Sequence, residues 1–318
     1  MTEVICHRGY SSRYPENTML AFQKAIETGA DGIELDVHLT RDGEVVVIHD
    51  ELVDRTTDGV GFVKDFSLAE LRRLNAAHGW EIAPQRVPTL EEYLERIAPT
   101  GLQSNIELKT GMFDYDGIEE KVWKLIDRFG LKDRVILSSF HVQTLLRLKA
   151  LAPEAPCGLL NQDRIIHPGW ATQALGLRAY HPLYLRLRPS VIRELKEHDV
   201  EVNAYTVNGH GPLAYLFLAD IHSVITNQPR RALALRRLIL VAEGAAQDVK
   251  AGSVPPGRHQ HHQQHRRQNQ EKDQKAPAAA FLSLPLRRLS VVVIPDVMSL
   301  FTHGAVHPHT KVLSGTVR

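Results

Sequence analysis

The stretch Val4-Ile5-Cys6-His7-Arg8-Gly9 places three apolar residues directly before a histidine, an arginine and a glycine. The apolar run predicts a buried strand, and the polar residues follow where that strand reaches the surface. Imidazole titrates near neutral pH, guanidinium binds phosphate oxygens through paired hydrogen bonds, and glycine lets a ligand approach the backbone. The combination suits a phosphate ester, although a histidine after a strand is more often a hydrogen-bonded loop residue.

Short apolar runs alternate with amphipathic segments over most of the chain, which is typical of βα units around a parallel sheet. The first strands are expected at residues 4–6, 32–37, 44–48 and 104–108, and the last at 223–226. Helices are expected after residue 18 and at 90–97, 117–129, 142–151, 191–198, 212–218 and 229–244. We interpret the pattern as eight strands with intervening helices, which in about 245 residues fits an α/β (β/α)8 TIM barrel.

Two segments depart from this order. Residues 51–86 are loop-like, with a small capped helix beginning at Ser67, and we interpret them as an insertion after the third strand. Residues 255–275 are rich in glutamine, histidine and charged residues and are too polar to form a core. We therefore predict a barrel domain at residues 1–250 and a largely disordered C-terminal tail at 251–318.

Charge and cysteine content limit the partners and the compartment. Residues 1–229 carry 24 Lys and Arg against 32 Asp and Glu, whereas residues 230–318 carry 14 against 5. An acidic body argues against nucleic-acid binding there. Two cysteines make no disulfide framework, and neither a leader peptide nor a run of the ~18 apolar residues needed by a membrane helix is expected. We expect a cytoplasmic protein without stable membrane insertion; no pattern indicates its oligomeric state.

Acidic side chains recur at alternate positions on two predicted strands. Glu34 and Asp36 point to the same face of one strand, and Asn105, Glu107 and Lys109 repeat the spacing on a later one. A glutamate and a lysine on one strand can simply pair with each other. Carboxylates that converge from two strands in a barrel interior, however, need a cation or a proton. Oxygen ligands select Mg²⁺ or Ca²⁺ over zinc, so we predict one such divalent cation.

Two histidines end apolar runs in the same way. His49 follows residues 45–48 as His7 follows the first strand, and in a barrel both are expected at the C-terminal face, where active sites lie. Together they can act as base and acid, and the pattern does not decide which is the initial base. His38 shares the face of Glu34 and Asp36, but we expect it to pack rather than to bind metal.

The sequence resembles the glycerophosphodiester phosphodiesterase family, closely over about its first third and more loosely up to residue 229. The resemblance rests on eight motifs in family order and spacing: His7-Arg8-Gly9, Pro15-Glu16-Asn17-Thr18, Glu34-Leu35-Asp36-Val37, Leu39-Thr40-x-Asp42-Gly43, Val47-Ile48-His49-Asp50, Arg55-Thr56-Thr57-x-Gly59, Val87-Pro88-Thr89-Leu90-Glu91-Glu92 and Asn105-Ile106-Glu107-Leu108-Lys109.

This resemblance implies a metal-dependent TIM-barrel hydrolase that cleaves glycerophosphodiesters to sn-glycerol 3-phosphate and an alcohol. It also implies roles by position. The metal ligands would be Glu34, Asp36 and Glu107, the acid/base pair His7 and His49, the phosphate contacts Arg8 and Lys109, and the supports of the first loop Glu16 and Asn17. Residues 51–86 would be the family's small insertion, which overhangs the site.

Two positions depart from the family pattern. Tyr205 stands where tryptophan is usual and keeps an aromatic wall for the substrate, and Asn227 stands where aspartate is usual and is expected to cap the last helix. Two alternatives remain open. One is a lysophospholipase D-type enzyme acting on lipid phosphodiesters, with an apolar rim from Trp80, Trp170 and residues 183–187. The other is a non-catalytic barrel that binds glycerophosphodiesters as a sensor. Residues 157–185 carry no clear motif, so the preferred head group is not indicated.

Overall fold

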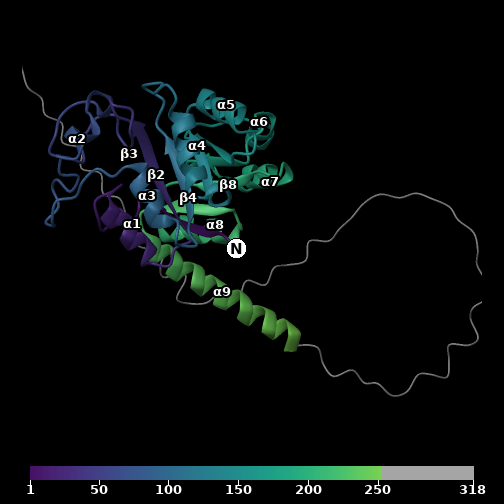
Figure 1. The fold of residues 1–318 in the computed structure, drawn as a ribbon. Helices are drawn as coiled ribbons and strands as arrows, with labels where there is room; N and C mark the ends of the chain where they lie inside the picture. Colours follow the sequence, from purple (N-terminus) through teal and green to yellow (C-terminus); the bar gives the residue numbers. More distant parts are fainter. Residues whose placement is uncertain (253–318) are drawn as a thin grey trace, which may run out of the picture. The chain divides into compact units, whose positions relative to one another are not determined.

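A closed barrel of parallel strands forms the centre of the computed structural model, which describes residues 1–252. The sheet order is β1-β9-β8-β7-β6-β5-β4-β2-β3, and β1 also pairs with β2, which closes the barrel (Figure 1). This confirms the predicted TIM barrel. The barrel strands are β1 (Glu3–His7), β2 (Gly32–Leu39), β4 (Gln103–Leu108), β5 (Val135–Ser139), β6 (Cys157–Asn161), β7 (Ala179–Pro182), β8 (Glu201–Ala204) and β9 (Ser223–Thr226).

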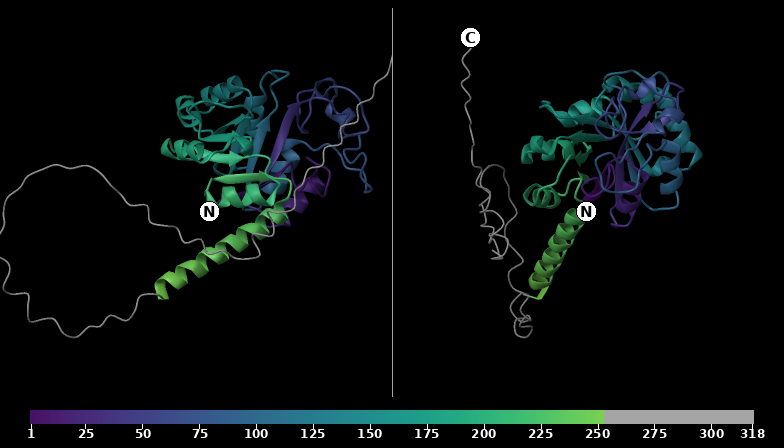
Figure 2. Two further views of the ribbon diagram at one scale, coloured as in Figure 1. Left: turned by 180° about the vertical axis from the view of Figure 1, so that it is seen from behind. Right: turned by 90° about the vertical axis from the view of Figure 1, so that its left-hand side faces the viewer.

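Most of the helices cover the outside of the barrel, whereas one lies in residues 51–86 and the last one extends away from the barrel, as Figures 1 and 2 show. The helices are α1 (Met19–Ile26), α2 (Leu68–Leu71), α3 (Leu90–Ile97), α4 (Ile118–Arg128), α5 (Val142–Leu151), α6 (Pro168–Ala174), α7 (Pro189–Glu197), α8 (His210–Leu218) and α9 (Pro229–Gly252), with short 3-10 turns η1 (Val63–Asp65), η2 (Lys132–Arg134) and η3 (Tyr184–Arg186). Within the described residues, no helix combines the length and apolar character needed to cross a bilayer. Beyond its first two residues, the predicted tail lies outside the described part of the chain.

Side-chain caps determine where several helices begin. The hydroxyl groups of Thr18, Ser67 and Thr89 each accept a hydrogen bond from a backbone N–H in the first turn of α1, α2 and α3. In α2 and α3, Glu70 and Glu92 return the bond to the backbone of the cap residue and complete a capping box. These caps were recognisable in the sequence. The helix α6 was not predicted, because its buried positions include Gly169 and Thr172 rather than an apolar stripe.

Alternation along β2 separates the core from the site. Ile33, Leu35 and Val37 are fully buried in the apolar cluster that the helices cover. Glu34 and Asp36 alternate with them and therefore face the barrel interior, since successive strand side chains point to opposite faces. One face of the strand thus packs in the apolar core, and the other presents two carboxylates to the barrel interior.

The third strand along the chain is not a barrel strand, and the expectation for residues 44–48 was wrong in this respect. β3 (Val45–Val47) pairs antiparallel with β2, with Val47 opposite Val37. Residues 40–44 connect the two strands, and a parallel crossover needs a dozen residues or more. The chain therefore turns back along β2, and the Ile48 N–H donates to the Asp36 carbonyl at 3.1 Å. His49 therefore lies at the C-terminal end of the barrel as predicted, but it follows an antiparallel strand and not a parallel barrel strand.

Residues 51–86 follow β3 and contain η1 and α2. They bury a small apolar cluster of their own, which includes Val53, Val63 and Leu71 together with Val46 and Ile48 from the β3 segment. The isolated bridge between Leu52 and Phe62 closes the loop at its base. The segment is therefore packed independently of the main barrel core.

Candidate active site

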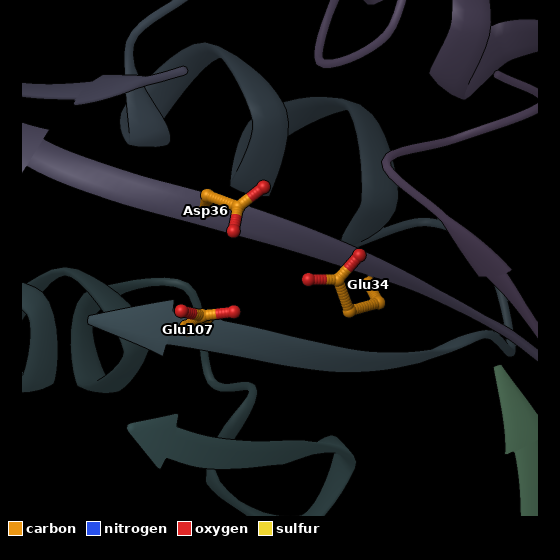
Figure 3. A group of neighbouring side chains, drawn as sticks. All are labelled: Glu34, Asp36 and Glu107. Carbon is orange, nitrogen blue, oxygen red and sulfur yellow. The ribbon is translucent and has the colours of Figure 1, made fainter. Parts of the chain in front are cut away.

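Three carboxylates meet at the C-terminal end of the barrel, as the sequence predicted. Glu34 and Asp36 come from β2, and Glu107 comes from β4, where it stands opposite Asp36 in the strand register. One oxygen from each lies within 4.8 Å of those from the other two. Figure 3 shows the three groups on neighbouring strands, gathered around a common space. All three side chains are buried, so their charges are only weakly screened by water.

The pKa values of the three carboxyl groups reveal a local excess of negative charge. Burial and the Asp36 charge raise the pKa of Glu34 well above its ordinary value and that of Glu107 to about 7. Burial also opposes ionisation of Asp36, but Arg8 and other cations outweigh it and hold the Asp36 pKa well below its usual range. Asp36 Oδ1 is buried without a hydrogen-bond partner in the described structure. Oxygen donors with unbalanced negative charge fit a hard divalent cation.

The raised pKa of Glu107 predicts that the metal-free protein becomes less stable as pH rises from about 4.5 towards about 7. In this window the folded protein retains a proton that the unfolded chain has released, so each pH unit lowers the free energy of unfolding by at most ~1.4 kcal/mol. Glu107→Gln removes the titrating group. Denaturant unfolding in a chelating buffer should therefore show the wild type losing stability relative to this variant as pH rises. A difference that stays constant across the window would contradict the raised pKa.

Two cations lie beside the carboxylates. Arg8 Nε is 3.4 Å from Asp36 Oδ2, and Lys109 Nζ is 2.8 Å from Glu107 Oε1. The backbone bends sharply at Arg8, where φ is 55°, and its N–H donates to Glu34 Oε2 at 2.9 Å. Gly9 follows at φ +80°, and a Cβ there would lie 2.8 Å from the Ala21 backbone. Glycine is therefore required for the turn that brings Arg8 to the site.

The two histidines flank the carboxylates, each with Nδ1 held by an acceptor. His7 Nδ1 donates to Asn227 Oδ1 at 2.6 Å, and His49 Nδ1 hydrogen-bonds to the Asp50 carboxylate. Their Nε2 atoms point to the cluster, that of His7 at 3.9 Å from Glu34 Oε2 and that of His49 at 4.0 Å from Asp36 Oδ1. Burial and the Arg8 charge lower the pKa of His7 to about 4. His7 is therefore neutral near pH 7.

Asn227 does not have the predicted capping role. The first helical bond of α9 runs from the Ala232 N–H to the Gln228 carbonyl at 3.0 Å, so Gln228 occupies the cap position. Asn227 follows β9, which neighbours β1 in the barrel, and its Oδ1 accepts from His7 and from Ser11 Oγ at 3.0 Å. The contact between Asn227 and His7 was not predicted, because the two residues become neighbours only when the first and last barrel strands pair in the tertiary fold.

The predicted supporting residues lie directly behind the cluster. Glu16 Oε1 accepts from Arg8 Nη1 at 2.9 Å, and Asn17 Nδ2 donates to Asp36 Oδ2 at 2.9 Å. Arg55 of residues 51–86 binds Glu16 Oε1 and Asp50 Oδ2, both at 2.6 Å. Neither Arg55 nor Asp50 was predicted as a site residue, although both belong to motifs that resemble the family pattern. The insertion is thereby tied to the residues that position Arg8 and His49.

Comparison with known proteins identifies the family to which the chain belongs. The sequence profile described as the glycerophosphoryl diester phosphodiesterase family matches residues 7–231. The chain belongs to this family. A glycerophosphodiester phosphodiesterase of Caldanaerobacter subterraneus subsp. tengcongensis is 44% identical over 240 residues, which covers 74% of this chain and 98% of the relative. The protein is accordingly a phosphodiesterase that hydrolyses glycerophosphodiesters, and the predicted resemblance is confirmed.

Solved structures agree with this assignment. An Oleispira antarctica phosphodiesterase in complex with the product sn-glycerol-3-phosphate superimposes with a TM-score of 0.65 at 28% identity, covering 74% of this chain and 96% of that one. A putative glycerophosphoryl diester phosphodiesterase from Silicibacter pomeroyi has a TM-score of 0.70 at 22% identity, covering 75% and 94%. The second likeness supports the fold alone.

His38 of the phosphodiesterase packs behind the site, as expected. It is fully buried, its Nε2 donates to the His49 carbonyl at 3.1 Å, and its Nδ1 accepts from the Tyr115 hydroxyl at 3.0 Å. These bonds fix the backbone of the chain segment that carries His49. His38 thus contributes to the position of His49 rather than to metal binding.

An aromatic pair borders the site of the phosphodiesterase. The rings of Tyr205 and Phe140 lie 6.0 Å apart at nearly a right angle, and Lys109 Nζ is 6.0 Å from the Phe140 ring centre. The Tyr205 hydroxyl is buried without a hydrogen-bond partner within residues 1–252. Phe140 was not predicted as a site residue. The only signal in the sequence is that it directly follows β5. In the predicted apolar rim, Trp170 and Leu185 are exposed, but Leu187 is buried.

Proposed function

We propose that the protein hydrolyses glycerophosphodiesters to sn-glycerol 3-phosphate and an alcohol with one bound Mg²⁺ or Ca²⁺ ion and with His7 and His49 as the acid/base pair. One observation carries the proposal, which is the cluster of Glu34, Asp36 and Glu107 between the Nε2 atoms of the two histidines. The sn-glycerol-3-phosphate bound to the Oleispira antarctica relative supports the same product.

The cation would be held by Glu34, Asp36 and Glu107, whose crowded charges it would balance. A divalent ion in this place supplies positive charge that offsets the charge developing on the phosphate oxygens. Arg8 and Lys109 lie beside the same carboxylates and add two fixed cations for the phosphate. Glu16 and Asn17 act as supports, because their contacts hold Arg8 and Asp36.

The histidines are arranged to move protons through Nε2, since Asn227 and Asp50 occupy their Nδ1 atoms. One imidazole takes the proton of the glycerol hydroxyl that neighbours the phosphate, and the tethered hydroxyl attacks phosphorus. The other imidazole gives a proton to the departing alcohol oxygen. Water then opens the resulting cyclic phosphate with the two roles reversed. Each histidine ends the cycle in the protonation state in which it began.

Tyr205 completes the proposed substrate contacts. Its ring forms a wall with Phe140, and its unpartnered buried hydroxyl supplies a hydrogen bond for a substrate oxygen.

Cys6 and Cys157 are buried free thiols, as expected in a reducing compartment, and we place the enzyme in the cytoplasm.

A metal-dependence screen tests this function. Purified full-length protein, stripped with a chelator, should release no glycerol 3-phosphate from glycerophosphocholine, -ethanolamine, -glycerol or -inositol. Added Mg²⁺ or Ca²⁺ should restore release from at least one of them. If no diester is cleaved with either ion, the non-catalytic sensor is favoured. Faster cleavage of lysophosphatidylcholine than of glycerophosphocholine would favour the lysophospholipase D alternative.

A further inference from the structure

A cavity of about 380 Å³ lies between the connection from β6 to α6 and the connection from β7 to α7. Both connections leave the C-terminal ends of barrel strands, on the same face as the carboxylate cluster. Residues 163–168 and 185–188 line the cavity together with Tyr180, Pro182 and the start of α7. Its volume is in the range of small-molecule sites, and Ile165, Leu187 and Val191 give it apolar surface.

Three arginines line this cavity, Arg164, Arg186 and Arg188. Within residues 1–252 none of them forms an ion pair, and the one side-chain bond among them runs from Arg186 Nε to the Gln162 carbonyl at 3.0 Å. The positive charges of these three arginines are therefore not neutralised by ion pairs within residues 1–252. Guanidinium groups without a carboxylate partner are suited to bind the oxygens of an anionic ligand.

Two carboxylates share the cavity and reduce its positive charge. Glu194 is engaged elsewhere, because its oxygens accept the backbone N–H groups of Gly169 at 3.0 and 3.1 Å and of Trp170 at 3.2 Å. Asp163 is the remaining acidic group in the lining. Three arginines against these two acids leave the cavity with net positive charge. We call it the arginine cavity, defined by Arg164, Arg186 and Arg188.

Tyr205 connects the arginine cavity to the active site. On one side its ring meets Phe140, which lies beside Lys109. On the other side its N–H donates to the Pro182 carbonyl at 3.1 Å, and its carbonyl accepts from the Tyr184 N–H at 2.9 Å. The segment that follows, from Leu185 onward, lines the cavity. Tyr205 thus stands between the aromatic wall of the active site and the chain segment that lines the arginine cavity.

We propose that the arginine cavity binds the leaving alcohol of the diester when that alcohol carries an anionic group of its own, such as a second phosphate. The inference rests on the proposed function, because it assigns the position of the departing group in that reaction. A second phosphate gains ion pairs with the arginines, whereas a neutral or cationic head group such as choline gains none. The preference should appear chiefly in KM, since the contact exists before bond cleavage.

The test compares substrates that differ by a single phosphate. Wild-type enzyme with its metal should hydrolyse glycerophosphoinositol 4-phosphate with a kcat/KM roughly tenfold above that for glycerophosphoinositol, the factor expected from about one strong charge-assisted contact. The variant R164Q/R186Q/R188Q should lose this preference and keep its rate on glycerophosphocholine. Arg193→Gln is the matched control, because Arg193 is on α7 but outside the cavity lining. It should retain the preference.

Equal use of the two inositol diesters by the wild type would overturn the inference and leave the proposed function intact. So would loss of glycerophosphocholine turnover in the triple variant, provided its melting temperature is unchanged. If no diester is hydrolysed at all, the proposed function fails, and calorimetric titration with inositol 4-phosphate then tests the cavity by itself. Binding to the wild type and to Arg193→Gln but not to the triple variant would support the arginine cavity. Absence of binding would refute it.

Discussion

His7→Ala and His49→Ala should each reduce kcat for glycerophosphodiesters by roughly 100-fold or more while leaving the fold intact. General acid and base groups contribute about 10² to 10⁴ to a rate, and each histidine presents Nε2 to the carboxylate cluster. Turnover at saturating metal and substrate gives the effect on kcat, and thermal unfolding of the same preparations checks the fold. His7→Ala removes one of the two hydrogen bonds to the Asn227 amide oxygen and leaves the one from Ser11 Oγ, so a loss of about 1 kcal/mol in stability is expected for that variant.

His78→Ala is the matched control for both histidine variants, because His78 is exposed within residues 51–86. It should keep the wild-type rate. A rate close to wild type in His7→Ala or His49→Ala would remove that residue from the acid/base pair. The assignment would then have to pass to another group at the barrel mouth.

Glu107→Gln and Asp36→Asn should each weaken binding of Mg²⁺ or Ca²⁺ by roughly 100-fold, with a parallel loss of activity at limiting metal. Each substitution replaces an ionic oxygen ligand by a neutral one in a site whose affinity depends on ligand charge. Calorimetric titration of metal-free protein measures the affinity directly. Metal at about 100 times its Kd should also stabilise the wild type by about 2.7 kcal/mol and the variants by much less.

Glu95→Gln provides the control for metal binding, because Glu95 is an exposed carboxylate on α3. Unchanged affinity in the control together with unchanged affinity in Glu107→Gln would show that the ion binds elsewhere. Recovery of the Asp36→Asn rate at high metal concentration would separate weakened binding from damage to the chemistry.

The barrel was predictable because its determinants are local. Apolar runs with β-branched residues mark the strands, and Thr18, Ser67 and Thr89 mark helix starts through their side chains. The carboxylate cluster was predictable for a related reason. Alternation places Glu34 and Asp36 on one face of β2, and the parallel pairing of β4 with β2 brings Glu107 beside Asp36.

Features that depend on partners distant in sequence were not predictable in this way. The Asn227 contact with His7 exists because β9 lies beside β1, and Arg55 contacts Glu16 across 39 positions of the sequence. The direction of β3 is a different case, since the short turn at residues 40–44 already required an antiparallel return. The arginine cavity depends on two loops without a recognisable motif.

A crystal of the protein grown with Mn²⁺, which substitutes for Mg²⁺ and Ca²⁺ and scatters anomalously, tests directly whether the three carboxylates bind one divalent cation. We predict one strong anomalous peak, with oxygens of Glu34, Asp36 and Glu107 at about 2.0–2.6 Å, as hard divalent cations require. A peak that lacks one of these three ligands, or no peak at a saturating Mn²⁺ concentration, would contradict this prediction.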